Sequence, residues 1–156
     1  MGHSSCWERI LLMRAALVLC LALCAGLAQA ASGLRMDQPW ARASLSGVKN
    51  AIVFGTLVND GSADLSIVGG STPVAARVEF HIHAMDGEVM TMRQLDTIDL
   101  KPGERTTLQP GGLHIMLIDL KQTLRQGESF PLTLMTRDGT TLKIDVTVTS
   151  PTATGP

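Results

Sequence analysis

Short apolar or alternating segments, separated by turn-forming residues, restrict this sequence to folds built from β-strands. Nine such segments follow residue 50, and none has a sustained helical period. They cover residues 51–58, 65–68, 77–83, 89–93, 97–100, 105–108, 114–120, 130–136 and 141–149. A single short helical turn is expected over 121–126. Eight or nine strands at this spacing predict an all-β Greek-key sandwich or barrel.

The last two segments allow their register to be predicted. Alternating apolar residues over 142–148 indicate a strand with one buried face. A three-residue loop over 137–139 would set Leu134 opposite Leu142, whereas a two-residue loop would set Leu134 opposite Lys143. We expect the three-residue loop, with its glycine in the left-handed conformation, because it matches apolar with apolar residues.

The first 30 residues have the pattern of a cleavable export signal. Arg14 precedes an unbroken run of small and apolar residues over 15–27, and an Ala-Gln-Ala cleavage pattern follows at 28–30. The run is short for a membrane-spanning helix. We therefore predict cleavage after Ala30, with Met13 as an alternative start and with no stable membrane insertion afterwards. An uncleaved membrane anchor is the alternative interpretation.

Removal of this segment would leave a chain without cysteine. The three cysteines, Cys6, Cys20 and Cys24, all precede residue 31. A lipid anchor on Cys20 or Cys24 is disfavoured, because each follows Leu where lipoprotein processing favours a small residue. The domain predicted over 31–149 would therefore be held by its apolar core without disulfides. The last residues, 150–156, are predicted to form a disordered tail.

Composition argues against nucleic-acid binding. The chain has 13 Lys plus Arg against 14 Asp plus Glu, a formal net charge of −1, so it lacks a basic excess. Aromatic residues make up 3%, and Tyr is absent, which is unlike a surface on which bases stack.

Histidine and methionine are concentrated in one part of the chain. After residue 30 there are three His and six Met, and all three His and four of the Met lie within 81–116. These residues are His81, His83, Met85, Met90, Met92, His114 and Met116. Thioether and imidazole form a soft donor set that suits Cu(I) and disfavours Ca, Mg or Mn. Thioethers also bind without losing a proton and stay available where thiols would be oxidised.

The loop near residues 86–87 decides whether these donors meet. A two- or four-residue loop would place His83 opposite Met90 and His81 opposite Met92, with Cβ atoms about 4.5–5.5 Å apart. A three-residue loop would turn both methionines toward the core, and the apolar pattern slightly favours it. The hairpin alone therefore leaves metal binding and core packing as alternatives.

His114 and Met116 strengthen the metal interpretation. They are two residues apart, so they share one face of a strand, and a Pro-Gly-Gly turn predicts that they lie near a sheet end. Singly, Met116 could fill the core and His114 could be a polar strand-end residue. Two His–Met groups in a cysteine-free exported chain favour a metal site.

At these residues the sequence resembles the periplasmic copper chaperones called PCu(A)C. The signature of that family is a His, ten residues, a Met, twenty-one residues, and then His-x-Met. His81, Met92, His114 and Met116 stand at those spacings. Some members carry a Met directly after the first His, where this chain has Ile82.

The resemblance implies a cupredoxin-like β-sandwich that binds one Cu(I), with Cu(II) as a secondary species. The ligands it implies are His81, Met92, His114 and Met116. Nearby accessory donors would be His83, Met85 and Met90. The resemblance also favours the register that opposes His81 and Met92. It further implies a periplasmic protein that delivers copper to the CuA centre in subunit II of cytochrome c oxidase, often alongside a Sco-type thiol protein.

Other functions have specific sequence requirements. A metal-free structural or accessory β-sandwich would bury Met92, and a general periplasmic copper-trafficking or tolerance protein would use the same donors for another acceptor. Catalysis is not expected. A blue-copper site needs a Cys thiolate, a copper oxidase normally needs more His, and no nucleophile elbow such as G-x-S-x-G occurs.

Overall fold

The computed structural model describes residues 33–87 and 89–156, in which ten β-strands occur. They are β1 (Leu34–Arg42), β2 (Asn50–Asn59), β3 (Leu65–Ser71), β4 (Ala75–Asp86), β5 (Val89–Leu95), β6 (Ile98–Leu100), β7 (Arg105–Leu108), β8 (Leu113–Leu120), β9 (Ser129–Thr136) and β10 (Thr141–Thr149). The all-β prediction is confirmed. The helical turn expected over 121–126 is wrong, because this stretch forms bends and a turn. The predicted signal peptide lies outside the described residues.

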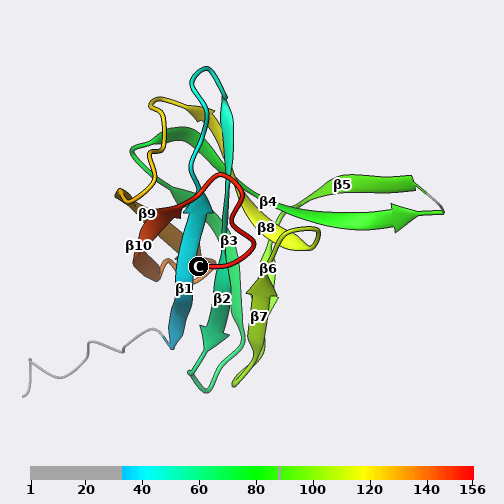
Figure 1. The fold of residues 1–156 in the computed structure, drawn as a ribbon. Coiled ribbons are helices and arrows are strands. Elements are labelled where there is room, and N and C mark those ends of the chain that lie inside the picture. Colours follow the sequence, from blue (N-terminus) through cyan, green and yellow to red (C-terminus); the bar gives the residue numbers. More distant parts are fainter. Residues whose placement is uncertain (1–32, 88) are drawn as a thin grey trace, which may run out of the picture. The chain divides into compact units, whose positions relative to one another are not determined.

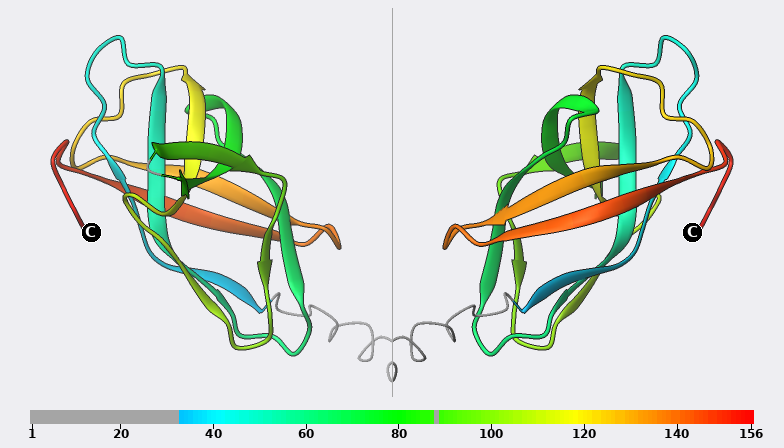
Figure 2. Two further views of the ribbon diagram at one scale, coloured as in Figure 1. Left: turned by 90° about the vertical axis from the view of Figure 1, so that its right-hand side faces the viewer. Right: turned by 90° about the vertical axis from the view of Figure 1, so that its left-hand side faces the viewer.

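The strands pair in one continuous but unclosed path. Its order is β5-β4-β8-β2-β1-β10-β9-β3-β6, with β7 paired to β2 beside it. The β1–β10 pair is parallel, and the other pairs are antiparallel. Because β5 and β6 end the path without pairing with each other, the barrel alternative does not form. Figure 2 shows β9 and β10 passing across β2 and β8, so the path folds into two layers. No helix in the described part of the chain could span a membrane.

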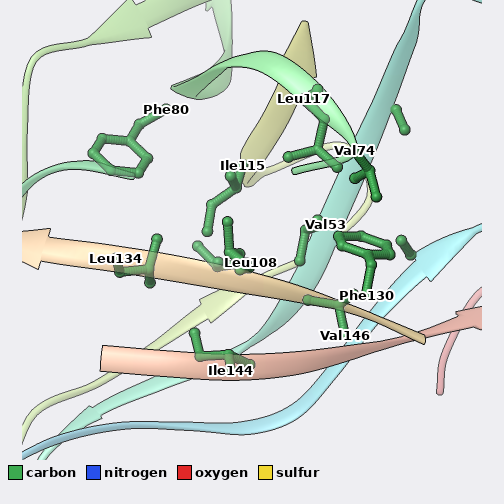
Figure 3. Close-up of a cluster of buried hydrophobic side chains, with 14 of the residues drawn as sticks. Val53, Val74, Phe80, Leu108, Ile115, Leu117, Phe130, Leu134, Ile144 and Val146 are labelled. Carbon is green, nitrogen blue, oxygen red and sulfur yellow. The ribbon is translucent and has the colours of Figure 1, made fainter. Parts of the chain in front are cut away.

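A buried apolar cluster lies between these layers (Figure 3). Strands β2 and β8 contribute Val53 and Ile115 to the cluster, and β9 and β10 contribute Leu134 and Val146. Each of these four side chains is fully buried. Burying an aliphatic side chain of this size contributes about 1.5–3 kcal/mol, so this core can stabilise the fold without disulfides.

Alternation along β4 and β8 gives each strand a core face and a second face. Phe80 on β4 lies opposite Ile115 on β8, and both side chains are buried in the core. Their neighbours His81 and His114 are also opposite each other, and period-two alternation directs them to the other face. The packing of Phe80 and Ile115 therefore fixes where the two imidazoles lie.

The predicted register of the last hairpin is confirmed. Leu134 lies opposite Leu142. The three-residue loop is closed by a hydrogen bond from Thr136 N to Thr140 O (2.9 Å), and Gly139 has φ +86°. Beyond β10, Arg42 Nε of β1 donates a hydrogen bond to Ala153 O (2.8 Å) in the turns that end the chain.

Strand β1 was not predicted from the sequence, because its regular pairing is interrupted. Its register with β2 shifts between Asp37 and Trp40, where Gln38 has φ +48° and a proline follows. A proline inside a segment is a sequence argument against a regular strand. The irregularity brings β1 close to Gly55 of β2, where a Cβ atom would lie 2.7 Å from Met36 Cε and 3.0 Å from Asp37 O.

We expect Gly55→Ala to lower the free energy of unfolding by about 1–3 kcal/mol, because φ is +147° there and the space is filled. Urea denaturation would measure the change. Gly69→Ala on β3 is the matched control, since a Cβ atom there has no neighbour within 4 Å. It should change stability by less than about 0.5 kcal/mol. Equal stability of the two variants would show that the contact with β1 is not tight.

Candidate metal centre

The β4–β5 hairpin carries the predicted donors on one face and projects away from the other strands (Figure 1). His83 lies opposite Met92, and Met85 lies opposite Met90. The core-packing alternative for these methionines is wrong, because the exposed fractions of Met92 and Met90 are 47% and 63%. Imidazole and thioether groups therefore lie on the same face of the β4–β5 hairpin, as expected.

The predicted pairing within this hairpin is wrong by two residues. His83 pairs with Met92 instead of Met90, and His81 lies opposite Gln94 instead of Met92. The pairing of Asp86 with Val89 leaves a two-residue loop that begins at position 87 and not at 86. Glycine suits either central position of a tight hairpin turn, so the Asp-Gly pair does not determine which residue begins the loop. Here Gly87, with φ +62°, stands first.

Strand β8 brings the remaining two predicted ligands beside β4. His114 lies directly opposite His81, and Met116 lies opposite Glu79. Met116 is half-buried, and β2 flanks it on its other side. His114 and Met116 share a face of β8, as their spacing predicts. His81, His114 and Met116 therefore lie together on adjacent strands, while Met92 lies on the next strand outward and further toward the hairpin loop, opposite His83.

His114 is 1% exposed, and a single backbone carbonyl orients its ring. Its Nδ1 lies 2.9 Å from Gly112 O, to which it donates as the neutral tautomer. The same carbonyl accepts the backbone N–H of His83 (3.3 Å). This carbonyl belongs to a turn in which Gly111 has φ +77°. A hydrogen bond from Gly112 N to Gln109 O (3.0 Å) closes the turn. The lone pair of His114 Nε2 is consequently free.

Burial lowers the pKa of the His114 imidazole below its ordinary value, because the charged form is poorly solvated there. The hydrogen bond to Gly112 opposes this effect, and the neighbouring His83 and His81 add to it. The neutral form of an imidazole is the form that binds a metal. The surroundings of His114 therefore favour its ligand form.

Glu79 orients the second imidazole, and sequence reasoning did not identify this role. His81 Nε2 lies 3.0 Å from Glu79 Oε2, while Arg77 Nη1 donates to Glu79 Oε1 (3.0 Å). A carboxylate that accepts one ring N–H leaves the other nitrogen free as a ligand. The sequence signal was available, since Glu79 and His81 are two residues apart and residues two apart on a strand share a face.

Three imidazole nitrogens in this cluster are buried without a hydrogen-bond partner. They are His81 Nδ1, His83 Nδ1 and His114 Nε2, and no other buried side-chain nitrogen or oxygen of residues 33–87 and 89–156 lacks a partner. The ring centroid of His114 is 6.0 Å from that of His81 and 5.1 Å from that of His83. An unpaired buried polar group costs about 1–3 kcal/mol, so three in one place indicate a ligand site.

The imidazoles require the methionine sulfurs to complete such a site. Within the described residues, no three His, Cys, Asp or Glu side chains are arranged to hold a metal ion. Thioethers of Met92 and Met116 lie on the same face as the imidazoles, and those of Met85 and Met90 follow further toward the hairpin loop. Imidazole nitrogen together with thioether sulfur is a donor set that suits a soft monovalent ion.

The accessory donors predicted from sequence occupy two different places. His83 belongs to the imidazole cluster, and its ring is closer to His114 than that of His81. Met85 and Met90 lie further out, as the last cross-strand thioether pair before the hairpin loop. The sequence could not separate these two roles, because they depend on the position of the loop.

The chain is similar to a described protein family over most of its length. The model of the family described as "Putative lipoprotein LpqE-like" matches residues 34–148. The putative lipoprotein Lxx21020 of Leifsonia xyli subsp. xyli (strain CTCB07) is 32% identical over 119 residues, which are 76% of this chain and 70% of that protein.

Solved structures of PCuAC domains have a similar fold. The apo PCuAC domain of PmoF2 has a TM-score of 0.67 at 28% identity, covering 80% of this chain and 95% of that one. The copper-bound PCuAC domain of PmoF2 has a TM-score of 0.66 at 28% identity, covering 76% and 94%. The Cu(I) form of DR1885 from Deinococcus radiodurans has a TM-score of 0.58 at 28% identity, covering 82% and 87%. The resemblance predicted from the motif is confirmed.

The hydrogen bonds predict opposite tautomers for the two imidazoles. In the metal-free protein near neutral pH, His114 should carry its proton on Nδ1 and His81 on Nε2. Long-range ¹H–¹⁵N NMR correlations distinguish the tautomers. Glu79→Ala is the matched test, because it should remove the preference of His81 and leave that of His114 unchanged. The same tautomer for both rings in the wild type would contradict the described geometry.

Proposed function

The chain belongs to the LpqE-like family, and we propose that it is a copper chaperone that binds one Cu(I) and passes it on without catalysing a reaction. The ligands are His81, Met92, His114 and Met116. The observation that carries this proposal is the group of buried, unpartnered imidazole nitrogens on the face that bears the thioethers. Copper-bound structures of the similar PmoF2 and DR1885 domains support copper as the metal.

The chemistry of the donors supports Cu(I) over harder ions. The ring of His114 is oriented by Gly112 through Nδ1 and that of His81 by Glu79 through Nε2, and in each ring the other nitrogen has no hydrogen-bond partner. The thioether ligands carry no charge, and the formal net charge of the chain is only −1. Selectivity therefore comes from the softness of the donors and not from electrostatic attraction.

The ligands are buried to different extents, which supports transfer of the copper ion to an acceptor and not its permanent storage. His114 is buried, whereas almost half of the Met92 side chain is exposed on the outermost strand of the path. An acceptor's ligand can enter on the Met92 side while the imidazole of His114 still holds the ion. Successive ligand exchange of this kind needs neither a redox step nor a proton transfer.

The acceptor and compartment that we propose follow from the resemblance to PCu(A)C proteins. Copper would be delivered in the periplasm to the CuA centre in subunit II of cytochrome c oxidase, with a Sco-type thiol protein as a second partner. Delivery to another periplasmic acceptor would use the same site. Transfer assays with a purified CuA domain, with and without a Sco-type protein, distinguish these acceptors.

A competition titration with a chromogenic Cu(I) chelator tests the site. The wild type should bind one equivalent, and the Met92→Ala, Met116→Ala double variant should bind at least about 100-fold more weakly, since even residues that only orient ligands contribute 10–100-fold.

Met135→Ala is the matched control for this titration. Met135 is 46% exposed, as Met92 is, but lies on β9, which does not pair with β4, β5 or β8. Its replacement should leave the affinity unchanged. Equal binding by the wild type and the double variant would refute the assignment of the thioethers as ligands.

The predicted processing can be checked separately, because the relatives are described as putative lipoproteins. Expression in a Gram-negative host followed by intact-mass measurement should give a soluble periplasmic product that begins at Ala31. A lipidated product beginning at Cys20 or Cys24 would instead identify a membrane-anchored form and would exclude cleavage after Ala30.

A further inference from the structure

The outer end of the β4–β5 hairpin exposes thioether groups that the rest of the described chain does not cover. Met85 and Met90 are 62% and 63% exposed, and Val89 is equally exposed. The two methionines lie directly opposite each other, so their Cβ atoms are about 4.5–5.5 Å apart. Such a pair of flexible, polarizable donors can bind one soft ion between them.

The hairpin places this pair in line with the inner site. Residues two apart on a strand share a face and are separated by about 6.5–7 Å. The Met85–Met90 pair is therefore followed inward by the His83–Met92 pair, and after that by His81. The ring of His83 is in turn 5.1 Å from that of His114, between centroids. Soft donors thus follow one another, at steps of about 6.5–7 Å along the hairpin, from the exposed end to the buried imidazole.

His83 is the donor that connects the two ends of this series. Its Nδ1 is buried and has no hydrogen-bond partner, although the proposed four-ligand site does not use it. Its backbone N–H shares the Gly112 carbonyl with His114 Nδ1, which fixes the two residues relative to each other. With the ring proton on Nε2, His83 Nδ1 can hold an ion that is moving between Met92 and His114.

We propose that Met85 and Met90 form a second, weaker Cu(I) site, through which the ion enters and leaves the inner site by way of His83 and Met92. This inference deepens the proposed function and rests on it for the direction of transfer. The outer site is weaker because it offers two thioethers exposed to water. Each step replaces one neutral donor by another, so copper stays Cu(I) and no proton is exchanged.

Ag(I), a soft ion that does not change its oxidation state, can probe both sites by NMR of the protein labelled with ¹³C at the methionine methyl groups. The first equivalent should shift the methyl signals of Met92 and Met116. Further Ag(I) should shift those of Met85 and Met90, with Met135 unchanged.

Replacement of both outer methionines by leucine tests the path. Met85→Leu with Met90→Leu keeps the apolar surface and removes the sulfur atoms. This variant should bind the first Cu(I) with wild-type affinity, but it should release copper to a chelator, monitored by stopped flow, about tenfold or more slowly. The same substitution at Met135 should leave both quantities unchanged.

The outcomes separate the two proposals. Unshifted Met85 and Met90 signals at excess Ag(I) would overturn the second site, and an unchanged transfer rate in the leucine variant would overturn the path. Failure of the wild type to bind the first equivalent would refute the proposed function and the path together, while the methyl shifts would still decide whether the outer pair binds metal. Slower transfer only to a protein acceptor, with chelator transfer unchanged, would show that the outer sulfurs contact a partner and would also overturn the path.

Discussion

The hydrogen bond from His114 Nδ1 to the Gly112 carbonyl ties the site to the turn that begins β8. It fixes the tautomer of a nearly inaccessible imidazole and directs the free Nε2 into the same cluster as two other unpartnered nitrogens. Because the carbonyl also accepts the backbone N–H of His83, it aligns β4 with β8 at this point. Neighbouring residues Phe80 and Ile115 anchor the same two strands in the core.

A gradient of exposure runs along the hairpin from this anchored end. The rings of His114 and His81 are held by hydrogen bonds, whereas the thioethers become progressively more exposed toward the loop, from Met116 to Met92 and then to Met85 and Met90. A rigid inner end would retain an ion, and flexible sulfur donors at the outer end would allow ligands to be exchanged. The arrangement therefore suits a carrier, which has to bind its metal firmly and still give it up.

Local sequence signals were sufficient to predict much of the fold. The alternation in β10 and its glycine-containing loop determine the register of the last hairpin, and the His-x-Met spacing determines one face of β8. Two features depend on information that the sequence does not carry locally. The register of β4 with β5 depends on which central position Gly87 occupies, and β1 is a strand despite its proline because pairing with β2 and β10 compensates for the irregularity. The role of Glu79 depends on a side-chain contact within β4 that spacing allows but does not require.

X-ray absorption spectroscopy of the protein loaded with one equivalent of Cu(I) reports the donor atoms around the metal and so shows whether imidazole and thioether bind it together. We expect a mixed coordination shell in which imidazole nitrogens from His81 and His114 contribute together with sulfur from Met92 and Met116. A spectrum without sulfur scattering, or one with sulfur alone, would contradict it.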